Sequence, residues 1–184
     1  MTPIKDGKGR GYLAEVNEDQ QLEVLSKSRP AIAKVSKDSG GSYVWTAVSA
    51  DIDTGDTALL VCNDSQTKNL HITKVYCWAD VAVQFKMHTP AYPTLAGTAV
   101  VGVCLNRALA KTAEATAKVD ETGNTFVEAN VVKTLRNNEL ATDEFGVHWD
   151  FEGALILGYH NSIAIDIIGE SLAFECSVEG YYEK

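Results

Sequence analysis

Hydrophobic and polar residues alternate with a period of two along most of the chain from Tyr43 onward. In residues 162–168, for example, three isoleucines alternate with Ser162, Ala164 and Asp166. This alternation predicts β-strands that bury one face and expose the other to solvent. Clusters of Gly, Asn, Asp and Ser separate the alternating segments and predict turns. We expect strands at residues 43–50, 57–62, 70–78, 81–88, 99–106, 126–135, 147–151, 154–157, 162–168 and 173–182.

About ten short strands without intervening helices predict an all-β fold. The only helix-like stretch among them is the alanine-rich segment 107–118, which we interpret as a loop with at most one helical turn. Long connections at 89–97 and 107–122 interrupt simple hairpins and favour Greek-key connections. We therefore predict a jelly-roll-like β-sandwich rather than a meander barrel.

The first 41 residues differ from the rest, and we predict an extended N-terminal arm at 1–41 and the sandwich at 42–184. The arm begins with a glycine-rich stretch at 7–11, and KDSGGS at 37–42 predicts a flexible joint. The arm holds seven basic and six acidic residues, whereas the remainder holds nine and nineteen. A second interpretation remains open, in which residues 22–25 add an edge strand to the sandwich.

Composition narrows the classes of function. The net charge of −9 argues against a general nucleic-acid or anionic-membrane binder, whose affinity comes from a basic surface. No apolar run is long enough for a membrane span, and the N-terminus lacks the apolar region of a secretory signal. We expect neither nucleic acid nor membrane as a partner. The four cysteines lie singly in apolar runs and predict free buried thiols rather than zinc ligands: Cys62, Cys77, Cys104 and Cys176.

The strongest enzyme signal is the triplet His148-Trp149-Asp150, because an H-x-D pair with a distant histidine is the iron site of jelly-roll oxygenases. His160 is the available third ligand, but its spacing is wrong and no arginine follows Arg136 to bind a co-substrate. We favour a solvated face of an edge strand, with Trp149 on the core side. With no other catalytic motif in the sequence, we predict a protein that is not an enzyme and uses no cofactor.

Two further motifs have simpler explanations than ligand binding. Asp51, Asp53 and Asp56 resemble a calcium loop but do not meet the EF-hand order, so we favour an ordinary turn, with a weak surface Ca²⁺ site as the alternative. The triplet Asn63-Asp64-Ser65 fits a glycosylation sequon, and we interpret it as a turn.

Paired aromatic residues leave a second binding hypothesis open. Tyr43 and Trp45 share one strand face, and Tyr76 and Trp78 share another. Exposed, these rings would stack on sugars, as in a lectin-like module, whereas buried they would belong to the core of the sandwich. We favour the core.

Several segments, taken in order, resemble those of small virion structural proteins of tailed bacteriophages. They are IKDGKGRGYLAEVN at 4–17, GDTALLVCNDSQTKNLHITKV at 55–75, GTAVVGVCLNR at 97–107, AEATAKVDETGN at 113–124, EGALILGYHNSIAIDI at 152–167 and VEGYYE at 178–183. The resemblance implies a capsid decoration or cement protein, made in the host cytoplasm and located in the virion. It also implies a homo-oligomer, preferably a trimer and alternatively a dimer, that binds the major capsid protein. A carbohydrate-binding or receptor-binding module of the tail or fibre is the alternative.

The basic tip of the arm is the predicted contact with the capsid or with a neighbouring subunit. Its basic residues stand beside a single acidic residue, Asp6, while the sandwich is acidic, and opposite charges favour docking. The predicted contact residues are Lys5, Lys8, Arg10 and Tyr12.

Overall fold

The computed structural model of the 184-residue chain divides into two units, Met1–Pro30 and Ala31–Lys184. It describes residues 4–5, 13–14, 31–49, 53–90, 97–109, 111–120, 131–136, 146–169 and 173–183. In the first unit, β1 (Ile4–Lys5) pairs with β2 (Leu13–Ala14) in an antiparallel arrangement. Residues 22–25, where an edge strand was one hypothesis, lie outside the described segments.

A short helix, α1 (Ala31–Ser39), opens the second unit and contacts β3 and β13. The prediction of a flexible joint at 37–42 is wrong, because the helix ends at Ser39 and β3 starts at Ser42. Gly40 adopts a left-handed φ of 63°, and its N–H donates to the carbonyl of Ser36 at 3.1 Å, which ends the helix. The structure thus divides the chain after Pro30, whereas we predicted the boundary after residue 41.

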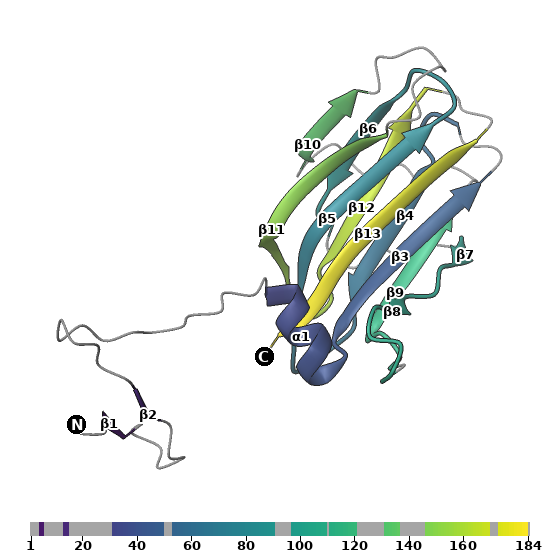
Figure 1. Cartoon of the computed structure of the whole chain (residues 1–184). Coiled ribbons are helices and arrows are strands. Elements are labelled where there is room, and N and C mark those ends of the chain that lie inside the picture. Colours follow the sequence, from purple (N-terminus) through teal and green to yellow (C-terminus); the bar gives the residue numbers. More distant parts are fainter. Residues whose placement is uncertain are drawn as a thin grey trace, which may run out of the picture. The chain divides into compact units, whose positions relative to one another are not determined.

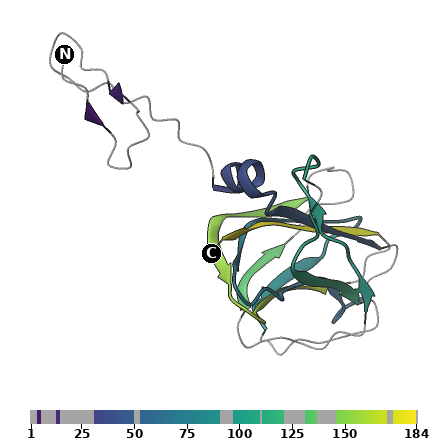
Figure 2. The same ribbon diagram turned by 90° about the horizontal axis from the view of Figure 1, so that it is seen from below.

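Two antiparallel sheets make up the second unit and confirm the predicted all-β sandwich (Figures 1 and 2). One sheet has six strands in the order β10 (Val131–Arg136), β6 (Gln84–His88), β12 (Ser162–Ile168), β4 (Thr57–Asn63), β9 (Ala115–Asp120) and β7 (Thr98–Ala99). The other has five, in the order β11 (Val147–Leu157), β5 (Asn69–Ala79), β13 (Phe174–Glu183), β3 (Ser42–Ser49) and β8 (Val103–Cys104).

The strand order is that of a jelly roll. Eight strands form two four-stranded sets, β3-β13-β5-β11 and β4-β12-β6-β10, with the chain crossing between sheets at most connections. Strands β7, β8 and β9, inserted between β6 and β10, extend both sheets on the same side of this frame. The predicted Greek-key wiring follows from this order.

The core fills the space between the sheets with the apolar faces that the alternation predicted. Its largest fully buried side chains include Trp45, Phe85 and Phe174. The prediction of one solvated face is wrong for β12, where Ser162, Ala164 and Asp166 are buried as well. This strand lies between β6 and β4, and Ala164 packs with Leu60 and Cys62 in a second buried cluster.

Several strand boundaries differ from those predicted. The segment 99–106 splits between β7 and β8, which belong to different sheets. In the segment 107–118, the described residues form a turn at 107–109 and then lead into β9, and none of them is helical. Residues 147–157 form one strand with a bulge, at which Glu152 and Gly153 have φ values of 50° and 85°. In the part of the chain that the structure describes, no helix is long and apolar enough to cross a bilayer.

Candidate functional site

The residues of the proposed iron motif lie on the edge strand β11. His148 and Asp150 are exposed, Trp149 is buried in the core, and the Asp150 carboxylate accepts the Glu152 N–H at 2.9 Å. His160 lies in the turn after β11, where its ring stacks on Tyr159 with centroids 3.7 Å apart. The solvated-edge interpretation is therefore confirmed for the placement of these side chains. Among the described residues, no group of three or more His, Cys, Asp or Glu side chains is arranged to hold a metal ion.

The acidic motif and the glycosylation sequon both lie in turns. Asp53 and Asp56 close a turn at 53–56, with the Asp56 carboxylate accepting the Asp53 N–H at 2.9 Å, while Asp51 lies outside the described residues. Asn63 is fully buried, and its amide nitrogen donates to the carbonyls of Lys68 and Leu157 at 3.0 and 2.8 Å. Its side-chain oxygen accepts the Ser65 N–H at 3.0 Å. In the folded chain this nitrogen is not accessible for glycosylation.

The cysteines and most of the paired aromatics are structural. All four thiols are free and buried, as predicted, and the Cys77 and Cys176 sulfurs lie 3.3 Å apart on neighbouring strands. Burial raises the pKa of the Cys62 thiol to about 12, which keeps it protonated and unreactive at neutral pH. Tyr43 and Trp45 belong to the core, whereas Tyr76 and Trp78 are half-buried on the other face of β5.

A polar pocket opens at the end of the sandwich where β3 begins and β13 finishes. Its volume is about 370 Å³. It draws residues from four places in the sequence: the α1–β3 connection, the β4–β5 loop, the segment before β9, and the end of β13. The lining residues are Ser39, Gly41, Tyr43, Lys68, Lys111, Thr112, Glu114, Tyr182 and Glu183.

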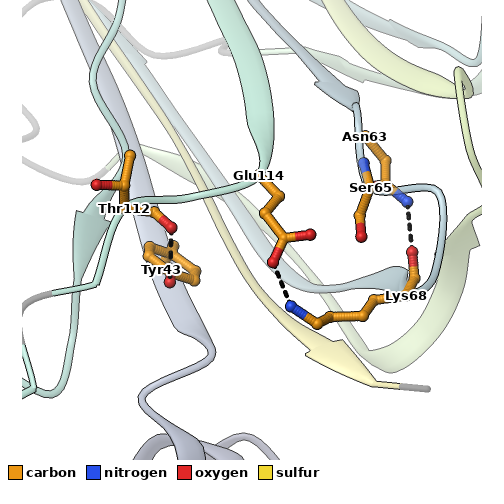
Figure 3. Close-up of polar contacts among 6 residues, drawn as sticks. All are labelled: Tyr43, Asn63, Ser65, Lys68, Thr112 and Glu114. Carbon is orange, nitrogen blue, oxygen red and sulfur yellow. Dashed lines mark hydrogen bonds and ion pairs between the residues drawn. The ribbon is translucent and has the colours of Figure 1, made fainter.

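Two tyrosines from neighbouring strands contribute the aromatic part of the lining. The rings of Tyr43 on β3 and Tyr182 on β13 meet edge-to-face, with centroids 5.7 Å apart. The Tyr43 hydroxyl donates to the Thr112 carbonyl at 3.1 Å, which ties the segment before β9 to β3 (Figure 3). Both rings are anchored in the core, so this part of the pocket is held rigidly.

An ion pair joins the β4–β5 loop to the segment before β9. The Lys68 ammonium donates to the Glu114 carboxylate, and the two side chains point toward one another in Figure 3. This hydrogen bond lowers the pKa of Glu114, with a smaller contribution from the Ser65 hydroxyl, so the carboxylate remains ionised. Asn63 fixes the backbone of Lys68 through the bond to its carbonyl. The lining carries two lysines and two glutamates, so its formal charges balance.

The Tyr182 hydroxyl has no hydrogen-bond partner among the described residues, although the side chain is only 6% exposed. Burial, with smaller contributions from Glu114 and Tyr43, raises its pKa, so the group is a neutral phenol. The Lys68 ammonium lies 6.0 Å from the centre of the same ring. A buried hydroxyl of this kind normally finds a partner, in water or in a ligand.

No pattern in the sequence marks this pocket. Lys68 and Glu114 are 46 residues apart and carry no motif, and only the fold brings them together. Tyr43 was noticed, but as one of a pair with Trp45 rather than with Tyr182. Of the predicted arm contacts, Lys5 lies in β1, while Lys8, Arg10 and Tyr12 lie outside the described residues.

Comparison of the chain with protein-family models, with curated proteins and with solved structures finds no match.

Proposed function

We propose that the chain is a non-enzymatic structural protein of a bacteriophage virion, of the decoration or cement type, that binds the head shell through its N-terminal unit. The observation that carries this proposal is the division of the chain after Pro30. The core of the described residues runs from Tyr43 to Tyr182, within the second unit. We assign the contact with a partner to the first unit.

The distribution of charge along the chain also supports binding through the first unit. The tip of the first unit is basic, with Lys5, Lys8 and Arg10, while residues 42–184 carry nineteen acidic and nine basic side chains. A basic segment docks favourably on an acidic surface of another protein. The partner we propose is the major capsid protein, and the sequence resemblance to small virion proteins supports it.

The test measures binding of the full chain to phage heads that lack this protein. The variant carries Lys5→Glu, Lys8→Glu and Arg10→Glu, which reverses the charge of the tip. We expect its affinity in co-sedimentation to fall about tenfold or more at low salt, with an unchanged melting transition, because complementary charge steers and stabilises docking. Tyr12→Ala in the same assay tests the remaining predicted contact.

The matched control reverses two exposed lysines of α1, with Lys34→Glu and Lys37→Glu. It alters net charge in the same direction but leaves the first unit intact, and its affinity for heads should stay within about twofold of the unmodified chain, because screened surface charges contribute little. Equal loss in both variants, or no loss in the tip variant, contradicts binding through the first unit. No binding of the unmodified chain to heads contradicts the proposed function itself.

A further inference from the structure

We infer that the polar pocket lined by Tyr43, Lys68, Glu114 and Tyr182 binds one uncharged, hydroxyl-rich ring, the size of a single sugar unit of a glycan. This site is separate from the N-terminal unit and goes beyond attachment to the head shell. It also differs from the sugar-stacking surface considered in the sequence, because Trp45 is fully buried and takes no part in it.

The size of the pocket favours a ligand with about one ring. A volume of about 370 Å³ admits a ring-sized molecule such as a hexose, together with the water that fills the rest of the pocket. The pocket lies near the lower end of the range for small-molecule sites, ~300–1,000 Å³. A folded peptide or several linked sugars would have to lie mostly outside it.

The balance of charge selects a neutral ligand. Lys68 and Lys111 supply hydrogen-bond donors, and Glu114 and Glu183 supply acceptors. An anion would meet the two carboxylates, and a cation would meet the two ammonium groups. Sugar hydroxyls both donate and accept, so they satisfy donors and acceptors of the lining at the same time.

The two tyrosines supply the other features that a sugar ring requires. Both side chains are largely buried, so only the parts of their rings that line the pocket offer apolar contact to the C–H groups of the sugar. The buried Tyr182 hydroxyl, which lacks a partner among the described residues, is a fixed polar group with hydrogen-bonding capacity to spare. The core holds both rings in place, so the pocket is preorganised and binding a ligand costs little ordering of side chains.

The test is titration of the full chain, by calorimetry and by ligand-observed NMR, with glucose, galactose, mannose and N-acetylglucosamine. Inorganic phosphate and acetate serve as ionic probes. We expect saturable binding of at least one sugar, with a Kd of about 1 mM or tighter, a weak affinity typical of few contacts, and no saturable binding of either ion. Glu114→Gln and Tyr182→Phe should each weaken sugar binding about tenfold, because the first replaces a charged acceptor that is paired with Lys68 and the second removes a hydroxyl.

Matched controls make the same chemical changes on the outer face of the five-stranded sheet, with Glu175→Gln and Tyr76→Phe. They should leave the affinity unchanged, and unchanged melting transitions show that the pocket variants are folded. Absence of binding by all four sugars, binding that the pocket variants do not weaken, or binding of phosphate or acetate would each overturn the inference. The charge-reversed tip variant should bind sugar with the affinity of the unmodified chain. The sugar site and the head-binding role of the first unit are therefore tested independently.

Discussion

At the scale of single residues, Asn63 has the most consequences for its surroundings. It ends β4, is fully buried, and makes three side-chain hydrogen bonds, to the loop residues Ser65 and Lys68 and to Leu157 of β11. Asn63 thus links the two sheets and sets the course of the loop that carries Lys68 into the pocket. A small amide suits this position because it donates and accepts simultaneously.

Replacing Asn63 with alanine should lower the free energy of unfolding by about 2–4 kcal/mol, because the change leaves buried backbone groups without partners. Urea unfolding followed by tryptophan fluorescence measures it. The control is Asn69→Ala at the exposed start of β5, which should change stability by less than about 0.5 kcal/mol. Similar stabilities for the two variants would show that the hydrogen bonds of Asn63 contribute little.

Sequence predicted some of these residues and not others. The buried, free state of the four cysteines followed from their apolar neighbours. The turn at Asn63-Asp64-Ser65 was predicted too, but not the burial of Asn63, because a sequon gives no information about what packs on it. The Lys68–Glu114 pair was not predicted, since nothing in the sequence distinguishes these two charges from other surface charges.

At the scale of elements, alternation predicted β12 to the residue but not its environment. Ser162–Ile168 has an apolar and a more polar face, and both are buried, with Ala164 of the second face packed against Leu60 and Cys62 of β4. Asp166 consequently meets His88 of β6, with 2.9 Å between the carboxylate oxygen and the imidazole Nε2. The Thr57 hydroxyl of β4 donates to the other carboxylate oxygen at 3.3 Å, and Lys86 is the registered neighbour on β6.

Helix α1 was not predicted from the sequence, and the reason is physical. It is only nine residues long, so its apolar positions, among them Ile32 and Val35, are too few to establish a helical period in the sequence. The signals that were present are terminal ones, Pro30 immediately before the helix and Gly40 immediately after it. The bulge in β11 was missed similarly, because Gly153 looked like a break between two strands.

The environment of Asp166 predicts a pH dependence of stability. Burial raises the pKa of its carboxyl to about 7, partly offset by the Thr57 hydroxyl and the charge of Lys86, from about 4 in an unfolded chain. The folded state therefore holds this proton more tightly than the unfolded state. The resulting stabilisation is fully present below about pH 4 and is lost as the pH rises through about 7.

The variant Asp166→Asn lacks this titration. Between about pH 5 and 7, the unfolding free energy of the unmodified chain should fall relative to that of the variant, by at most about 1.4 kcal/mol per pH unit, the limit for one proton. Urea unfolding at a series of pH values gives the comparison. The control is Asp150→Asn, at an exposed position on β11. Its unfolding free energy should vary with pH in parallel with that of the unmodified chain. Parallel curves for Asp166→Asn would mean that this carboxyl titrates alike in both states.

At the scale of the whole molecule, alternation and turn residues predicted the all-β sandwich, because burial of one face per strand is visible in sequence. The glycines at 40 and 41 were taken for a joint between the arm and the sandwich, whereas they follow α1 and lead into β3. The order of strands in each sheet depends on long-range packing. The pocket forms where strands and loops become neighbours through that packing, so it could not be predicted from the sequence.

The proposed homo-oligomer, preferably a trimer, has a candidate interface at the β3–β8 side of the five-stranded sheet. Apolar side chains are exposed there, with Val48 at 70% and Val103 at 45%. Val44 of β3 is the registered neighbour of Val103, so the two strands present one continuous surface. Exposed apolar residues on an edge strand favour association with another copy of the chain.

The double variant Val48→Lys, Val103→Lys should dissociate the oligomer, because two desolvated charges per subunit oppose burial of this surface. Light scattering should give a multiple of 19.9 kDa for the unmodified chain and the single-chain mass for the variant. The control, Val132→Lys on β10, places the same charge on an exposed valine at the edge of the six-stranded sheet and should leave the oligomer intact.

A single-chain mass for the unmodified protein at high concentration contradicts the oligomer. An intact oligomer in the double variant moves the interface away from β3 and β8. The other edge of the five-stranded sheet, β11, is then the next surface to test, by the same substitution at Ile156.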